Sequence, residues 1–278
     1  MKVAAIQMVS ATSLDANLQS AQALLNEAAQ AGVELAVLPE YFCLMGRKDT
    51  DKLAIQEPFG HGQIQAFLSQ TARALKIWIV GGTLPISIDN PSGDPSISTR
   101  VFNTSLAFSP SGECVARYDK IHLFKFDNGQ EAFDESRVLL RGTQPTQFEM
   151  TDRAGQTWRI GMSVCYDLRF PELYRHYSKS GADVLLVPSA FTYTTGEKHW
   201  ELLLRARAIE NQAFVVAPAQ GGLHENGRRT WGHSLLIDPW GEVLAQRPVD
   251  AGVVCHDLVF ARRSECHARL PALSHRIM

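Results

Sequence analysis

One pattern of residues occurs twice in this chain at a constant offset, and this repeat limits the folds open to it. The pattern Ser-Leu-x3-Pro-x-Gly-Glu-x2-Ala begins at Ser105 and again at Ser234. Each copy predicts a hairpin with Pro and Gly at its turn. The pieces 32–39 and 181–188 also match, each opening with Gly and closing with Pro. Coincidence between two similar turns is one explanation; we favour two similar α/β halves whose sheets face each other, with helices outside.

Apolar runs alternate with amphipathic segments along both halves, which is typical of an α/β protein. Segments that begin near Pro or end at Gly or Asn predict helices. We expect a single domain over 1–278, whose polar, irregular tail from about Arg262 packs at an interface. The predicted helices are 17–31, 63–75, 171–179 and 197–211, and the predicted strands are 3–8, 35–38, 77–80, 101–108, 114–118, 158–164, 184–187, 214–217, 233–237 and 243–245.

The composition excludes several classes of protein. A net charge of −2 favours neither nucleic acid nor an anionic membrane as a partner. No apolar run approaches the roughly 20 residues of a membrane helix, and the first apolar stretch breaks at Gln7, too early for a signal peptide. Five cysteines without a Cys-x-x-Cys pair argue against a disulfide framework and a structural zinc site. We therefore expect a cytoplasmic protein with no bound metal.

Cys165 is the first candidate for chemistry. It follows the predicted strand 158–164 and precedes Pro171, where a helix is predicted to begin. A nucleophile at such a turn lies at the carboxyl edge of a sheet, near backbone N–H groups that can bind an oxyanion. Because a helix N-terminus lowers the pKa of a thiol, we expect a reactive thiolate. The alternative is a buried structural cysteine.

Two charged residues end other predicted strands. Glu40 follows Pro39 at the end of an apolar run, and open α/β sheets place ligands at the carboxyl ends of strands. Lys120 ends the second strand of the first hairpin. Each alone is also compatible with a surface charge. Together with Cys165 they supply a thiol nucleophile, a carboxylate base and a cation where negative charge develops.

Five segments of the chain carry a resemblance to a known family. The segments 38–40, 118–123 and 164–173 contain the three candidate residues, and 200–212 and 231–241 follow them. In order and separation they resemble the blocks of the nitrilase superfamily of carbon–nitrogen hydrolases, over nearly the whole chain. The resemblance implies a four-layer α-β-β-α sandwich with an internal pseudo-two-fold repeat, and a homodimer.

The resemblance also implies roles by position. Glu40 is similar to the general base, Lys120 to the cation that stabilises the tetrahedral intermediate, and Cys165 to the nucleophile. The backbone N–H of Tyr166 would complete the oxyanion hole. The implied reaction cleaves an amide through a thioester and needs no metal or organic cofactor.

The family often has a second glutamate in the loop after the lysine. Glu135 is the candidate for this supporting position, and Glu131 is the alternative.

The segments 188–201 and 217–221 look closest to the Nit-type branch of the family. That branch includes deaminated glutathione amidases and ω-amidases that act on α-ketoglutaramate. The segment 205–210 favours the deaminated glutathione amidases, with the ω-amidases as the alternative.

Both substrates carry carboxylates, so a pocket arginine is expected. Arg169 can bind a carboxylate with two parallel hydrogen bonds; the alternative is a structural ion pair with Asp167 or Glu172. Phe191 and Thr192 follow a predicted strand end and are candidates for the pocket wall.

Three other classes of function have less support in the sequence. A Cys–His protease lacks support because the segment around Cys165 has no local signature of such a family. A non-catalytic binding protein of the same fold would be indicated by loss of a reactive residue type, and all three are present. An N-acyltransferase of the same superfamily is disfavoured because no membrane segment or acyl-donor domain is predicted.

Overall fold

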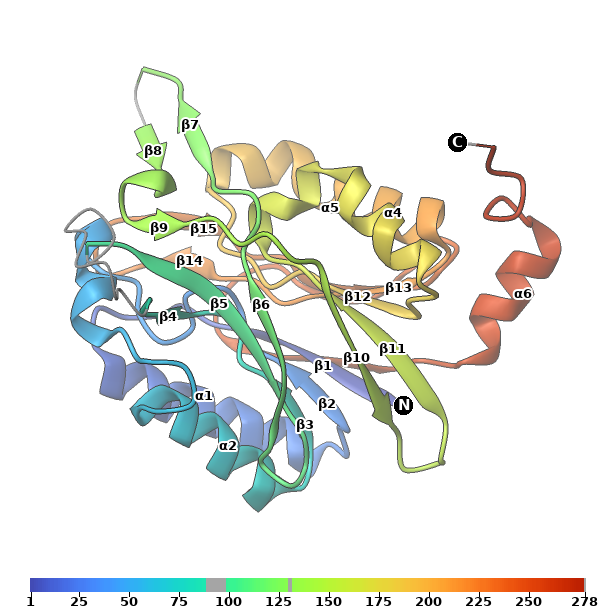
Figure 1. Cartoon of the computed structure of the whole chain (residues 1–278), viewed down its shortest axis with the longest axis horizontal. Coiled ribbons are helices and arrows are strands. Elements are labelled where there is room, and N and C mark those ends of the chain that lie inside the picture. The colour runs from blue at the N-terminus through green and yellow to red at the C-terminus, as the bar shows by residue number, and fades with distance from the viewer. Residues whose placement is uncertain (89–98, 130–131, 278) are drawn as a thin grey trace.

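Two β-sheets lie face to face with helices on their outer sides (Figure 1). The computed structural model describes residues 1–88, 99–129 and 132–277. The first sheet has the order β18-β1-β2-β3-β5-β4, and β6 and β9 pair with β5. Its elements are β1 (Lys2–Gln7), β2 (Leu35–Val37), β3 (Trp78–Val80), β4 (Leu84–Ile86), β5 (Val101–Phe108), β6 (Cys114–Asp119), β9 (Leu139–Leu140) and β18 (Gly252–Asp257), with helices α1 (Leu14–Gln30) and α2 (Gln63–Leu75).

The second sheet has the order β10-β11-β12-β13-β16-β17. Its elements are β10 (Thr146–Thr151), β11 (Thr157–Met162), β12 (Val184–Leu186), β13 (Phe214–Ala217), β16 (Ser234–Ile237) and β17 (Val243–Arg247), with helices α4 (Pro171–Lys179) and α5 (Tyr193–Asn211). Two small hairpins pair β7 (Lys125–Asp127) with β8 (Ala132–Asp134), and β14 (Gly221–Leu223) with β15 (Arg229–Trp231).

The layering follows from the two-residue period of the strands. In β1, Val3 and Ala5 join the apolar cluster that includes the second sheet, whereas Ala4 and Ile6 join the cluster that includes α1 and α2. A strand whose faces are both apolar must be covered on both sides. The predicted four-layer α-β-β-α sandwich is therefore confirmed.

The internal repeat is visible in the strand pairing. In the first sheet β1, β2 and β3 are parallel, and β5 and β6 then add antiparallel. In the second sheet β11, β12 and β13 are parallel, and β16 and β17 add in the same way. The matching hairpins are β5–β6 and β16–β17. The predicted pseudo-two-fold repeat is confirmed.

Most predicted elements have the expected bounds, and the differences have local causes. Helix α1 begins before residue 17 because the Ser13 side chain caps it by accepting from the N–H of Ala16. Helix α5 begins at Tyr193 rather than residue 197 because Thr192 caps it in the same way. The strands of the two small hairpins, and strands β4, β9 and β10 of the main sheets, were not predicted.

The prediction of an irregular tail from Arg262 is wrong, because helix α6 (Ala261–Arg269) forms there. Arg262 binds Asp238 at 2.8 Å, Arg263 binds Asp183, and Cys266 is buried. Partners distant in sequence therefore stabilise a helix that has little apolar surface of its own. Among the described residues no helix is long and apolar enough to cross a membrane.

Candidate active site

The three candidate residues follow strands whose ends lie together between the sheets. Glu40 lies just beyond β2, Lys120 directly follows β6, and Cys165 lies just beyond β11. The turn that carries Glu40 needs a glycine beside it: a Cβ on Gly82, whose φ is +46°, would lie 2.0 Å from the carbonyl oxygen of Pro39.

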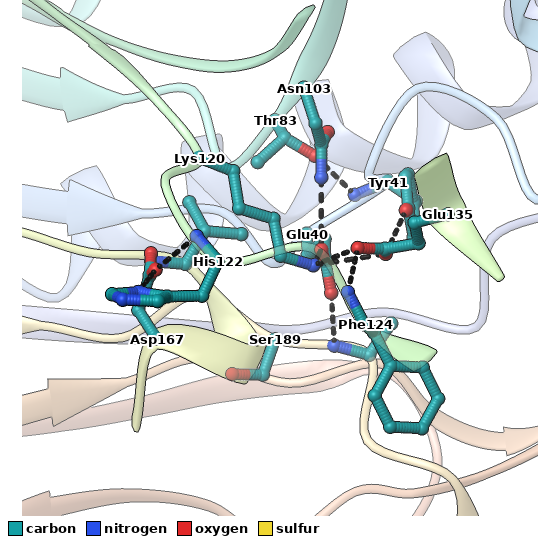
Figure 2. Close-up of polar contacts among 12 residues, drawn as sticks. Glu40, Tyr41, Thr83, Asn103, Lys120, His122, Phe124, Glu135, Asp167 and Ser189 are labelled. Carbon is teal, nitrogen blue, oxygen red and sulfur yellow. Dashed lines mark hydrogen bonds and ion pairs between the residues drawn. The ribbon is translucent and has the colours of Figure 1, made fainter. Parts of the chain in front are cut away.

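Lys120 lies at the centre of a buried group of charges (Figure 2). Its Nζ is 2.9 Å from Oε1 of Glu40, and 2.9 and 2.8 Å from Oε1 and Oε2 of Glu135. Lys120 is fully buried and Glu40 is 1% exposed. One ammonium thus stands between the carboxyl groups of Glu40 and Glu135.

Each carboxylate is held by further donors. Asn103 Nδ2 donates to Oε1 of Glu40 at 3.0 Å, and the N–H of Ala190 donates to Oε2 at 3.0 Å. These bonds orient the Glu40 side chain from both sheets.

Glu135 is held in the same manner. The Tyr41 hydroxyl donates to its Oε1 at 2.8 Å, and the N–H of Phe124 donates to its Oε2 at 2.7 Å. Glu135, the candidate for the second glutamate, thus lies beside Lys120. The alternative residue, Glu131, lies outside the described residues.

Burial and charge shift the pKa values of this group in opposite directions. Burial by itself lowers the pKa of Lys120, but Glu135 and Glu40 outweigh it and hold that pKa above its usual range. Burial by itself raises the pKa of Glu135, but the charge and hydrogen bonds of Lys120 outweigh it and hold that pKa below its usual range. Lys120 is therefore a cation and Glu135 an anion at neutral pH.

Cys165 sits in a strained turn at the edge of the second sheet. Its φ is +49°, in the left-handed region that non-glycine residues seldom adopt. The residue is buried, with only 8% of its surface exposed. The N–H of Cys165 donates to the carbonyl of Pro188, and the N–H of Asp167 donates to the carbonyl of Val164. The N–H of Tyr166 lies between these two hydrogen-bonded groups in the chain.

The expectation that a helix N-terminus lowers the pKa of the Cys165 thiol is wrong. Burial raises the pKa of the Cys165 thiol, and the negative charge of Glu40 raises it further, although Lys120 opposes them. A 3-10 helix of only five residues (Cys165–Arg169) follows the strand, rather than α4 itself. The dipole of so short a turn does not offset burial beside a carboxylate. Cys165 is therefore a thiol at neutral pH.

Asp167 supports this turn from below. Its Oδ2 accepts from the Tyr118 hydroxyl at 2.7 Å and from the N–H of Val164 at 2.9 Å, and its Oδ1 lies 2.7 Å from Nδ1 of His122. Asp167 is fully buried. The network links the segment after β6, which carries Lys120, to the segment after β11, which carries the cysteine.

A pocket of about 290 Å³ opens above these groups. It brings together all the described candidate residues except Lys120, which lies buried beneath it. The candidates that line it are Glu40, Glu135, Cys165, Tyr166, Arg169, Phe191 and Thr192.

Arg169 lines the pocket rather than forming the structural ion pair considered above. Its guanidinium lies 5.4 Å from the ring centroid of Phe191 and 5.7 Å from that of Tyr166, and its Nη1 is 3.2 Å from Nδ1 of His199. Among the described residues it makes no ion pair with a carboxylate, so its charge is available to a ligand.

Sequence reasoning missed Asn103, Tyr41 and Arg228. The first two hold the carboxylates, and Arg228 lines the pocket from the loop between β14 and β15. Asn103 lies inside a strand and Arg228 in a polar turn, where neither residue type signals a role. No group of three or more His, Cys, Asp or Glu side chains in the described part of the chain could hold a metal ion.

The class of protein follows from this fold and from comparison with known families. The model of the carbon-nitrogen hydrolase family matches residues 2–268. The chain belongs to the carbon-nitrogen hydrolase family, as its resemblance to the nitrilase superfamily predicted.

Individual relatives narrow the class to amidases. The chain is 38% identical over 276 residues to a deaminated glutathione amidase of Synechocystis sp., covering 99% of this chain and 97% of that protein. It is 36% identical over 262 residues to omega-amidase NIT2 of Xenopus tropicalis, covering 94% and 89%. Nit3 of Saccharomyces cerevisiae, a member of branch 10 of the nitrilase superfamily, has a TM-score of 0.86 at 28% identity and covers 100% and 97%. The chain is a hydrolase of carbon–nitrogen bonds in amides.

Proposed function

We propose that this enzyme hydrolyses a small carboxylate-bearing amide through a thioester on Cys165, and that its substrate is deaminated glutathione. One observation carries the proposal: a buried Lys120 held between Glu40 and Glu135, beside the cysteine that lines the pocket. This arrangement has a nucleophile, a base and a fixed cation within one site.

Acylation begins with Glu40 as general base. Glu40 accepts the thiol proton as Sγ of Cys165 adds to the amide carbon, and the N–H of Tyr166 together with Lys120 Nζ stabilises the oxyanion. Glu40 then donates the proton to the leaving nitrogen. The carbon–nitrogen bond breaks, the amine departs, and a thioester remains.

Deacylation reverses the proton transfers with water as nucleophile. Glu40 takes a proton from water as the oxygen adds to the thioester carbon. The carbon–sulfur bond then breaks, and the proton returns to Sγ of Cys165. The acid product leaves, and the site is again a neutral thiol beside a carboxylate.

Glu135 acts by positioning Lys120. Both of its oxygens and one oxygen of Glu40 lie within hydrogen-bonding distance of the ammonium. The cation is therefore held in place before substrate arrives, so stabilising the transition state requires little reorganisation.

Two observations support an anionic substrate of the deaminated glutathione type. Arg169 offers a guanidinium to a carboxylate within the pocket, with Phe191 and Thr192 as its wall. The relative at 38% identity is a deaminated glutathione amidase. Deaminated glutathione would yield α-ketoglutarate and cysteinylglycine. The second candidate is α-ketoglutaramate, favoured by the similarity to omega-amidase NIT2.

The experiment follows α-ketoglutarate release from each amide. Wild type, Cys165→Ala and a matched control, Cys255→Ala on β18, are compared. We expect turnover in wild type and the control and none in Cys165→Ala, with deaminated glutathione preferred. Selective alkylation of Cys165 without turnover of either amide would contradict the proposed substrate and still support a reactive cysteine at this site. An inert Cys165 would favour a binding protein of the same fold.

We also propose that the chain is one domain throughout and forms a homodimer in the cytoplasm. Five free cysteines suit a reducing compartment. Helix α6 lies at one end of the molecule (Figure 1), with exposed Val259, Leu270 and Ile277 around it. These apolar residues support an interface at that end. Light scattering should give twice 30.8 kDa; a monomer at working concentration would contradict it.

A further inference from the structure

A second groove adjoins the pocket of Cys165. It has a volume of about 550 Å³ and is lined by the 3-10 helix η1 (Asp49–Ile55), strand β8 and the loop that carries Arg228. Phe124, Glu135 and Arg228 line both cavities, so the two meet at these residues.

Arg228 stands at the junction with spare hydrogen-bonding capacity. Its Nε is buried and has no partner among the described residues. Its Nη2 donates to the carbonyl of Ala190 at 3.3 Å, and its guanidinium lies 5.2 Å from the ring centroid of Phe133. It forms no ion pair with a carboxylate of the described chain. A buried guanidinium donor is seldom left without an acceptor unless a ligand supplies one.

Lys52 brings a second cation to the groove. Its Nζ lies 5.0 Å from the ring centroid of Tyr41, and it too makes no ion pair within the described residues. Burial lowers the pKa of Lys52, against the opposing charges of Glu135 and Asp49. Three carboxylates line the groove: Glu135 binds Lys120, Asp134 lies 3.5 Å from Lys125, and Asp49 lies near enough to Lys52 to raise its pKa.

The pocket of Cys165 and the groove differ in the residues that line them. Arg169, Phe191 and Thr192 line the pocket of Cys165 and not the groove, whereas Tyr41 and Lys52 line the groove and not that pocket. A leaving nitrogen must be protonated, which places it beside the carboxylates where the cavities meet. The acyl group then lies towards Arg169 and the amine towards the groove.

We propose that the groove is a subsite for the leaving amine, and that Arg228 and Lys52 bind its carboxylate. The inference rests on the proposed function and narrows it to secondary amides whose amine is a short anionic peptide. An extended dipeptide spans about 7 Å, enough to carry a terminal carboxylate away from the scissile bond into the groove.

The test compares two amides that share an acyl group. Deaminated glutathione releases a dipeptide and α-ketoglutaramate releases ammonia. In Arg228→Gln and Lys52→Gln we expect kcat/KM for deaminated glutathione to fall about 10- to 100-fold, as for loss of a charge-assisted hydrogen bond. Lys52 lies outside the pocket of Cys165, so Lys52→Gln should leave turnover of α-ketoglutaramate within about three-fold, and Arg228→Gln should lose less with α-ketoglutaramate than with deaminated glutathione. The matched control is Arg229→Gln, whose exposed side chain stacks on Tyr193 outside both cavities.

A change on the substrate side tests the same contact without relying on a variant's folding. Replacing the terminal carboxylate of deaminated glutathione by a carboxamide should weaken wild-type turnover by the same factor, and Arg228→Gln should no longer distinguish the two. Equal losses of kcat/KM for both amides would show that Arg228 binds the acyl group or stabilises the fold, and would contradict the subsite. Unchanged turnover of deaminated glutathione would overturn the subsite.

If wild type cleaves neither amide, the proposed function fails and the subsite is tested by binding. Calorimetry with cysteinylglycine and its carboxamide should then show binding that needs both the carboxylate and Arg228. Binding that needs neither, or none at all, would overturn the subsite independently of the reaction.

Discussion

The two halves of the molecule have the same strand pairing and end their equivalent strands with different chemistry. In the first half Pro39 is followed by Glu40, and at the matching place in the second half Pro188 is followed by Ser189. Glu40 binds Lys120, whereas the hydroxyl of Ser189 donates to the carbonyl of Val187 in its own turn. The same fold thus carries a charged group at the end of one strand and an uncharged, locally hydrogen-bonded turn at the end of the other.

The matching edges face each other across the site. The N–H of Ala190, next to Ser189, donates to Oε2 of Glu40, and Gln220 Nε2 donates to the Glu40 carbonyl at 3.0 Å. The first half supplies the buried charges and the second supplies Cys165 and the pocket arginine. Duplication therefore provides two edges that meet, and the residues at those edges decide what each contributes.

The largest effect is expected at the nucleophile. Cys165→Ala should lower kcat about 10⁴-fold or more, because a covalent route is lost entirely. Its melting temperature should stay close to that of wild type, since a small side chain is removed at a strained turn. Amide turnover and calorimetric melting measure both, and residual activity above one-hundredth would assign the nucleophile elsewhere.

The comparison of the two strand ends is sharpened by substituting both. Glu40→Gln keeps the shape of the side chain and removes the base, so kcat should fall about 10²- to 10⁴-fold. Ser189→Ala, at the equivalent place, should change kcat by less than about three-fold. Steady-state turnover distinguishes them. Similar losses of kcat at both positions would show that both strand ends contribute to catalysis, and would contradict a role for Glu40 alone.

Lys120 should matter for stability as well as for turnover. Lys120→Met leaves two buried carboxylates without their cation, and we expect the free energy of unfolding at pH 7 to fall by about 3–5 kcal/mol. Lys125→Met removes a lysine that is 77% exposed, 3.5 Å from Asp134, and should cost less than about 0.5 kcal/mol. Urea unfolding measures both; equal values would refute the buried cluster.

The smallest effect concerns the protonation of Cys165. Burial and the charge of Glu40 raise its pKa above the ordinary value of 9.0. Because the thiolate is the reactive form, alkylation by iodoacetamide should quicken about ten-fold per pH unit between pH 7 and 9. Peptide mass spectrometry follows the rate at this residue. A plateau near pH 7 would show a lowered pKa for this thiol, as the helix N-terminus suggested from the sequence.

Much of the fold was predictable because its signals are local. Helices α2 and α4 and strands β5 and β13 have the bounds that periodicity, Pro and Gly predicted. Helix α6 was missed since its stability comes from Asp183 and Asp238, which are far from it in the sequence. Local patterns cannot report partners of that kind.

The candidate site divides in the same way. Glu40, Lys120 and Cys165 were recognisable from strand ends and from the family resemblance. Asn103 and Tyr41 were not, because an asparagine in a strand and a tyrosine after a glutamate are common without any role.

The sequence by itself determined most of the strands and helices, the repeat and the three candidate side chains, since periodicity and turn residues act over a few neighbours. The tertiary structure alone decided how the carboxylates share Lys120, why Cys165 rests as a thiol, and where Arg228 stands. Those outcomes depend on burial and on distances between groups from both halves, and such distances exist only once the two sheets have packed together.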